Sequence, residues 1–328
     1  NWVNRLRGVE FGGEHTLGRL KLDYNVRHNQ THLNSGNQRA GDLTMRLNNI
    51  GWIHDSSKSD VCPQYIQTAG PDVTNPANYR PAPNGLVSRK VDQDQDIDEA
   101  KINAAYELPW DAMPTTVKTG AAWRDQTVTQ FQNNRRWSYI GTEPLPNDPS
   151  FVRYDTVKTG RNLPVWEAKQ FMIDGLRPSA PSLWSEDSYY RESQLYLGDK
   201  WVNEEIMAGY LMAEGKLGDR GWRRRTGFLT GVRVERTETE SRGYVRARNG
   251  TTAAEQAADP VGSAKRDYAG TKRELHGEYT KSFPSVHLTH DVTSNLKARL
   301  SWSTSFGRPS LSSLLPSETV NETAQTLT

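Results

Sequence analysis

The chain has 328 residues, with 41 Lys and Arg against 39 Asp and Glu, and this near-balance gives no electrostatic reason to expect a nucleic-acid partner. Hydrophobic residues make up only 34%, but 10 Trp and 13 Tyr argue against a disordered chain. The single cysteine, Cys62, excludes an intrachain disulfide and a zinc cluster built on cysteines. No apolar run reaches the ~18–20 residues of a membrane helix, which leaves open a β-barrel of shorter strands.

Alternating apolar and polar residues predict antiparallel β-strands along the chain, because neighbours in a strand point to opposite faces. From Gly18 onward, apolar side chains oppose Arg19, Lys21, Asp23, Asn25 and Arg27. The segment at Ile206 is weaker, since Met207 and Leu211 interrupt its alternation. The apolar members of the seven segments are, in chain order, Leu20, Leu22, Tyr24 and Val26; Ala100, Ile102, Ala104, Tyr106 and Leu108; Val117, Ala121 and Trp123; Ile206, Ala208, Tyr210 and Met212; Phe228, Val232 and Val234; Val286, Leu288 and Val292; Leu296, Ala298, Leu300, Trp302 and Phe306.

Short and long connections are expected to alternate between these strands. Short turns are predicted near Gly12–Thr16, Pro109–Pro114, Gly215–Trp222 and Thr293–Asn295. Long polar connections are predicted from about Thr31 to Asp98, Thr129 to Asn203 and Glu240 to Glu274. A soluble domain seldom contains repeated long loops without structure of their own, whereas outer-membrane barrels combine short periplasmic turns with long extracellular loops.

The polar strand faces carry many cations. In a soluble sandwich this would be a solvated sheet face; in a barrel it would line the lumen. Charge alone does not separate the two readings, while loop asymmetry favours the barrel. The residues predicted to face the lumen are Arg19, Lys21, Lys101, Lys118, Arg124, Arg233, Lys297 and Arg299.

The C-terminal third contains motifs in a characteristic order. Phe283-Pro284-Ser285 is followed by a short turn, by a strand running from Ser303 to Arg308-Pro309, and by Leu315-Pro316. Upstream, Glu204 to Leu211 and Gly231 to Thr237 read as the preceding hairpin. Over roughly residues 200–320, this order and spacing resembles the barrel of TonB-dependent receptors.

The resemblance implies a barrel of 22 strands with an N-terminal plug, located in the outer membrane of a Gram-negative bacterium. It also implies uptake of a scarce large solute, such as a siderophore, cobalamin or an oligosaccharide, with energy from the TonB complex. This sequence holds only about eight candidate strands, with no plug and no TonB box. We therefore expect residues 1–328 to be one partial barrel domain: an all-β, antiparallel transmembrane segment forming an open sheet.

Chemical motifs are weak. The acidic run from Asp92 to Glu99 departs from a calcium-binding EF-hand loop, because Ile97 and Asn103 stand where Gly and Glu are required; a solvated acidic loop is the simpler reading. The seven histidines lack HExxH spacing, and no GxSxG elbow is present. We expect no enzyme, no cofactor and no metal.

The long loops are rich in Arg and aromatic residues, Trp52 and Tyr65 among them, that could recognise solute by stacking and charge. The same side chains could instead pack the loops together or anchor them at lipid headgroups. Arg135 and Arg136 beside Trp137 form the most interesting group. The predicted solute-binding candidates are Arg135, Arg136, Trp137, Tyr139, Trp184, Tyr189 and Tyr190.

Three functions remain open: a TonB-dependent transporter, a passive porin-like channel, and a soluble glycan-binding β-sandwich. For the barrel readings we expect Leu20, Leu22, Tyr24, Leu300 and Trp302 to face outward, and Arg19, Lys21, Lys297 and Arg299 to face the lumen. A piece of a large barrel keeps the curvature of the whole, because strand number and tilt set the diameter. The edges near Asn4–Gly12 and Leu296–Phe306 should therefore lack partners.

Overall fold

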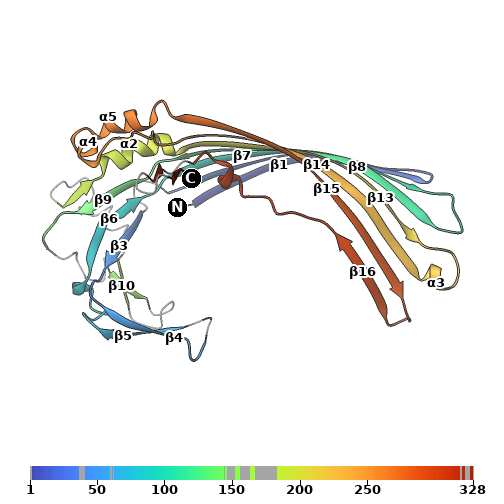
Figure 1. Ribbon diagram of the computed structural model, residues 1–328, viewed down its shortest axis with the longest axis horizontal. Coiled ribbons are helices and arrows are strands. Elements are labelled where there is room, and N and C mark those ends of the chain that lie inside the picture. The colour runs from blue at the N-terminus through green and yellow to red at the C-terminus, as the bar shows by residue number, and fades with distance from the viewer. Residues whose placement is uncertain are drawn as a thin grey trace.

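The computed structural model describes residues 2–36, 41–59, 61, 63–143, 145, 152–155, 163–166, 183–317, 320–321 and 326–327. Its main element is one antiparallel eight-stranded sheet in the order β1-β2-β7-β8-β13-β14-β15-β16. Figure 1 shows the sheet as a long arch. The strands are β1 (Trp2–Leu17), β2 (Leu20–Ser35), β7 (Val91–Glu107), β8 (Thr115–Gln132), β13 (Asp199–Lys216), β14 (Thr226–Tyr244), β15 (Lys272–Asp291) and β16 (Lys297–Ser303).

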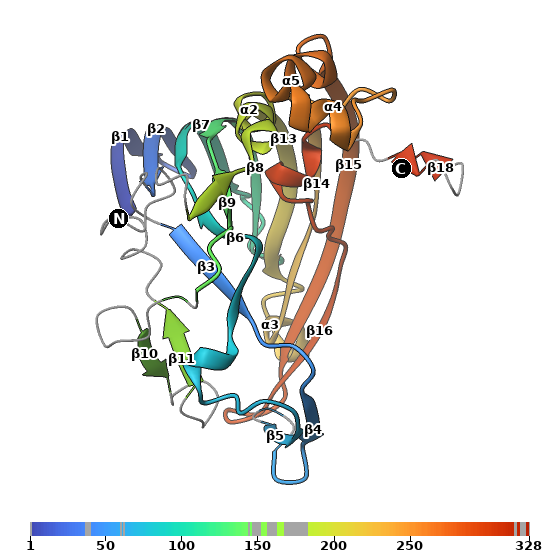
Figure 2. The same cartoon turned by 90° about the vertical axis from the view of Figure 1, so that its left-hand side faces the viewer.

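The sheet is open within the described residues, because β1 and β16 are its two edges and do not pair with each other. Figure 2 shows the sheet from its loop end, with β1 and β15 at opposite sides. The expected all-β antiparallel architecture and the two unpartnered edges are confirmed.

Connections alternate in length, as predicted. The four turns after β1, β7, β13 and β15 lie at one end of the sheet, and the three long connections lie at the other (Figure 1). The long connections are not structureless, however. They contain a four-stranded sheet in the order β12-β9-β6-β3, the hairpins β4–β5 and β10–β11, and several helices.

The elements of the long connections and of the chain ends are short. The strands are β3 (Gly41–Arg46), β4 (Gly51–Asp55), β5 (Gln64–Ala69), β6 (Arg80–Ser88), β9 (Arg135–Tyr139), β10 (Val152–Asp155), β11 (Leu163–Trp166), β12 (Trp184–Glu186), β17 (Val320–Asn321) and β18 (Thr326–Leu327). The helices are η1 (Pro76–Asn78), α2 (Ser188–Leu197), α4 (Ala253–Ala258), α5 (Pro260–Tyr268) and η2 (Leu311–Leu314), with α3 (Gly221–Arg224) in a short turn.

The first turn lies at Gly18 and Arg19, not at Gly12–Thr16 as predicted. Gly18 has a φ of +63°, which suits glycine in a tight hairpin turn. Gly12 and Gly13 lie inside β1 instead, opposite Asn25 and Tyr24. A Cβ on Gly13 would meet the Tyr24 hydroxyl at 2.8 Å. Gly13 therefore makes room for the Tyr24 side chain on the neighbouring strand.

The acidic run from Asp92 to Glu99 is also not a loop, because it lies in β7. Its alternate carboxylates face polar partners on β2: the Asp98 carboxylate lies 2.7 Å from His28 Nδ1, and that of Asp94 lies 2.8 Å from His32 Nδ1. Asn34 donates to Asp92 in the same way. Cross-strand pairing thus extends the strands beyond their apolar stretch. The seven long strands of the sheet, all but β16, contain 16 to 20 residues.

Directly paired residues in an antiparallel sheet share a face, so the register assigns each residue to one of two faces. One row runs Phe11, Val26, Ala100, Trp123, Met207. On β13 the apolar face therefore holds Met207, Gly209 and Leu211. The prediction for this strand, which placed Ile206, Ala208, Tyr210 and Met212 on the apolar face, is wrong. These residues share the face of Arg124 and Lys118, where Ile206 and Ala208 are buried.

The apolar face is unusually exposed. Its row on β15 and β16 includes Leu300, which is 70% exposed, and Trp302. Leu20, Leu22 and Tyr24 lie on this face too, as predicted. We call the exposed side chains of this face the apolar band: Val9, Phe11, Leu17, Val26, Ile102, Tyr106, Trp123, Met207, Leu211, Val232, Val234, Val286, Leu300 and Trp302.

The chain after β16 crosses the opposite face of the sheet, and the course of this chain identifies that face as the concave one. Phe306 stacks on Phe283 of β15 at 5.5 Å, and Leu314 accepts a hydrogen bond from Ser241 of β14. Figure 1 shows this segment running beneath the arch. We call residues 304–317 the crossing segment. The apolar band therefore lies on the convex side of the sheet.

Candidate functional site

The seven predicted solute-binding residues come together at the loop end of the sheet. Four lie on β9, Trp184 lies on β12, and Tyr189 and Tyr190 lie on α2. Pairing of β9 with β12 places Trp184 directly opposite Tyr139, with ring centroids 5.2 Å apart. The sequence located this cluster, although Trp184 is distant from Tyr139 along the chain.

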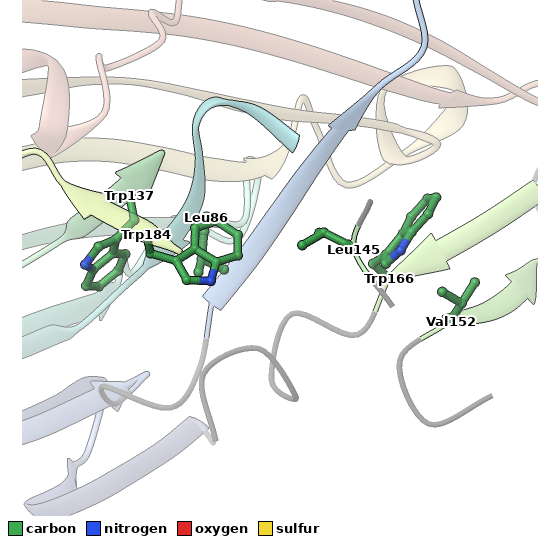
Figure 3. Packing of buried hydrophobic residues seen from close by; sticks show 6 residues of the cluster. All are labelled: Leu86, Trp137, Leu145, Val152, Trp166 and Trp184. Carbon is green, nitrogen blue, oxygen red and sulfur yellow. The ribbon is translucent and has the colours of Figure 1, made fainter. Parts of the chain in front are cut away.

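Both tryptophans in this cluster are buried. Trp137 is 4% exposed and Trp184 is 1% exposed. They belong to a small hydrophobic core with Leu86, Leu145, Val152 and Trp166, shown in Figure 3. A fully buried aromatic side chain contributes mainly to stability. The loops therefore have their own core, and these two rings are part of it.

The two arginines are already paired. Arg135 donates from Nε and Nη2 to the Glu186 carboxylate at 2.6 and 2.9 Å. Arg136 donates to Asp187 Oδ2 at 2.9 and 2.6 Å, and its guanidinium lies 4.1 Å from the centre of the Tyr190 ring. Forked arginine–carboxylate pairs fix geometry and neutralise charge. Neither arginine therefore presents a free positive charge to an anionic solute.

Tyr189 fixes one long connection to another. Its hydroxyl donates to Asp267 on α5 at 2.5 Å. The Asp267 carboxylate is buried and also accepts from Arg246 Nε at 3.0 Å and from the Thr251 backbone amide at 2.7 Å. Burial pushes the pKa of Asp267 upward, but these hydrogen bonds outweigh burial and hold it below its usual value. Burial, together with the bond to Asp267, raises the pKa of Tyr189.

These contacts pack the loops against one another. Loop packing is the alternative to solute binding that the sequence also allows for these side chains. Whether any of the seven residues also contacts solute stays a prediction. Sequence reasoning missed Glu186, Asp187 and Asp267 as partners. The two carboxylates that follow Trp184 along the chain were a usable signal, because pairing of β9 with β12 places Glu186 opposite Trp137 and brings both carboxylates within reach of the arginines.

The predicted lumen-facing cations share the concave face. The register places Lys21, Lys101, Lys118, Arg124, Arg233, Lys297 and Arg299 there, whereas Arg19 lies in the turn after β1. That this face lines a lumen stays a prediction.

Most of these cations have carboxylate partners on the same face. Lys118 Nζ lies 2.6 Å from Glu214, Lys21 Nζ lies 3.3 Å from Glu107, and Lys297 Nζ lies 3.2 Å from Asp291. Arg27 and Arg124 both pair with Glu99. The face is a mixed-charge wall, close to neutral in balance.

The crossing segment joins this wall through ions. Arg308 lies 2.9 Å from Glu235 Oε1, and Arg233 lies 2.5 Å from Glu235 Oε2. A hollow of about 360 Å³ opens between these groups and Arg27, Glu99 and Arg124. Its lining of four arginines, one lysine and three glutamates suits a polar, hydrated surface.

Two aromatic residues in the loops differ from the buried cluster. Trp52 and Tyr65, on the β4–β5 hairpin, are 56% and 50% exposed. Sequence reasoning included them among the loop aromatics without distinguishing them from the others, because exposure cannot be read from residue type.

No helix in the described residues is long and apolar enough to cross a membrane, and those residues contain no group of three or more His, Cys, Asp or Glu arranged to hold a metal ion. No model of a known protein family matches the chain, and a search of curated proteins finds no significant relative.

Proposed function

We propose that the chain is part of the barrel of an outer-membrane transporter of the TonB-dependent receptor type. The observation that carries the proposal is the division of one continuous sheet into an exposed apolar convex face and an ionic concave face. Lipid on the convex side and water on the concave side would satisfy both faces. The motifs from Phe283 to Pro316 supply the resemblance to the family.

On the strands β7, β8, β13, β14 and β15 the apolar band ends abruptly toward the loops. The next paired row on the same face holds five carboxylates on adjacent strands: Asp98, Asp125, Glu205, Glu238 and Glu278. Like charges directly opposite one another destabilise a sheet unless water or counter-charges reach them. This row therefore supports a boundary between lipid and headgroups at this level.

Strand length supports the same arrangement. Strands of 16 to 20 residues reach about 50–65 Å at ~3.3 Å per residue, whereas the lipid-facing band of an outer-membrane barrel is ~25 Å tall. Strands that project beyond the membrane explain the polar ends of β2 and β7. The open edges at β1 and β16 leave unpaired backbone groups that further barrel strands would satisfy.

A porin-like channel is the second candidate, because it would share the same two faces. One feature distinguishes the two functions. A TonB-dependent transporter requires a plug domain and a TonB box, which would be encoded upstream of Asn1, whereas a porin-like channel does not. We expect the full-length product to fractionate with the outer membrane and its solute uptake to be abolished by deletion of TonB. Uptake that persists without TonB would favour the channel. Recovery in the soluble periplasm would reject both and favour the glycan-binding sandwich.

A further inference from the structure

The β4–β5 hairpin carries an aromatic face that no other part of the described chain uses. Trp52, His54 and Tyr65 share one face, because His54 pairs directly with Tyr65 and Trp52 lies two residues before His54. The Tyr65 ring lies 5.2 Å from that of Trp52 and 5.1 Å from that of His54. All three side chains are exposed. We call these three residues the aromatic platform.

The base of the hairpin holds this platform in place. The Gln67 amide donates to the backbone oxygens of Ala69, Gly70 and Pro71, and its oxygen accepts from the Val73 amide. Gly70 has a φ of +86°, and a Cβ there would lie 2.1 Å from the Asn49 oxygen. Only glycine fits this approach. A rigid platform loses little entropy on binding.

The platform lies away from the convex face. Both views place β4 and β5 beyond the concave side of the sheet, opposite the apolar band (Figures 1 and 2). Contact with bilayer lipid would require the convex side. The platform is therefore away from bilayer lipid, and an occupant must reach it from the aqueous side. Exposed aromatic groups of this kind mark binding surfaces.

The chemistry of the platform fits a neutral sugar ring. An aromatic face is electron-rich and attracts polarised C–H bonds, and a pyranose presents such bonds on one face and hydroxyl groups around its edge. The His54 ring nitrogens can exchange hydrogen bonds with those hydroxyls. Neither β4 nor β5 contains a Lys or Arg. An anionic iron chelate would require such a cation, and Arg135 and Arg136 are already neutralised by Glu186 and Asp187.

We propose that the aromatic platform binds a saccharide, which would make the solute of this protein an oligosaccharide. The inference rests on the proposed function only in placing the platform in the path of an imported solute. The stacking itself requires only the hairpin.

The test uses the full-length protein in detergent and isothermal titration calorimetry. The probes are maltohexaose, cellohexaose, xylohexaose and mannohexaose, with a ferric tris-catecholate complex as the anionic alternative. We expect at least one hexasaccharide to bind, and Trp52→Ala and Tyr65→Ala each to weaken its affinity about tenfold. Trp52→Phe keeps a ring and should retain affinity within about threefold.

The matched control is Ile53→Ala, since Ile53 is 54% exposed on the opposite face of the same hairpin. It should bind like the unmodified protein. The platform proposal is overturned if none of the four hexasaccharides binds, if affinity is unchanged in Trp52→Ala and Tyr65→Ala, or if only the ferric complex binds. Saccharide binding through Trp52 in a protein recovered from the periplasm would overturn the transporter and leave the platform. Binding of the ferric complex alone by an outer-membrane protein would overturn the platform proposal and leave the transporter.

Discussion

Arg308 and Glu235 form an ion pair with a separation of 2.9 Å across the concave face, although 73 residues separate them along the chain. Glu235 also holds Arg233, and its side chain is 12% exposed. The pair fixes the crossing segment to the middle of β14. Along the segment, Arg308 lies between the ring contact of Phe306 and the hydrogen bond of Leu314.

Removing this pair should loosen the crossing segment without unfolding the sheet. We expect Arg308→Ala to cost about 1 kcal/mol or less, because the pair remains partly solvated. Hydrogen exchange of residues 304–317 should accelerate several-fold while that of β13 and β14 is unchanged. The control is Arg299→Ala, since Arg299 lies on the same face and has no ion-pair partner among the described residues. Equal exchange in both variants would show that the pair does not hold the segment.

Asp267 should make the contact between α2 and α5 dependent on pH. Its folded pKa lies below the ordinary value of 3.8, so the ionised carboxylate contributes stability above about pH 4. That stability is lost as the pH falls through the lowered folded value.

At neutral pH we expect Asp267→Asn to cost about 2–3 kcal/mol, because its hydrogen bonds involve a charged acceptor. Amide exchange in α2 and α5 measures the loss. Asp219→Asn, at an exposed pair in a short turn, serves as the control and should change nothing. Unaltered exchange in Asp267→Asn would show that the carboxylate does not stabilise the packing of α2 against α5.

The convex face should reject charge if it meets lipid. We expect Leu300→Arg to cost ~2–4 kcal/mol in the full-length barrel when the residue lies near mid-bilayer. Ser301→Arg, one residue away on the concave face, should be close to neutral. Urea unfolding in lipid vesicles compares the two. A similar cost for both substitutions would argue against a lipid-facing convex surface.

Trp184 should act through stability, because its ring is almost completely buried. Replacing it by Ala should destabilise the loop core by about 3–5 kcal/mol. Limited proteolysis of residues 133–198 in the full-length protein should show early cleavage. Trp110→Ala removes a ring that is 51% exposed in a short turn and should leave cleavage unchanged. Resistance of Trp184→Ala to proteolysis would mean that the ring is not a core residue.

The sequence predicted strand faces well wherever alternation was strict. Leu22 and Ile102 could be assigned because each sits in a run of period two, and one shared register then orders the sheet. On β13 both alternating sets are apolar, so periodicity could not decide, and only pairing of Met207 with Trp123 resolved the face.

Positions governed by distant partners could not be predicted. Gly12 and Gly13 resemble turn residues until the Tyr24 ring is seen across from Gly13. Asp92 to Asp98 resemble a loop until β2 supplies histidines opposite them. Likewise, the seven loop candidates could be grouped by composition, but burial of Trp137 and neutralisation of Arg135 depend on β12, about 50 residues away.

The central claim is that one sheet separates lipid from water, and a cysteine scan along β13 tests it most directly. Single cysteines at residues 207 to 212, in the full-length protein lacking other cysteines, would carry a nitroxide spin label in vesicles. We expect labels at Met207, Gly209 and Leu211 to be relaxed by lipid-soluble oxygen, and labels at Ala208, Tyr210 and Met212 by a water-soluble nickel complex. Greater access of the nickel complex to the odd-numbered positions would contradict the account.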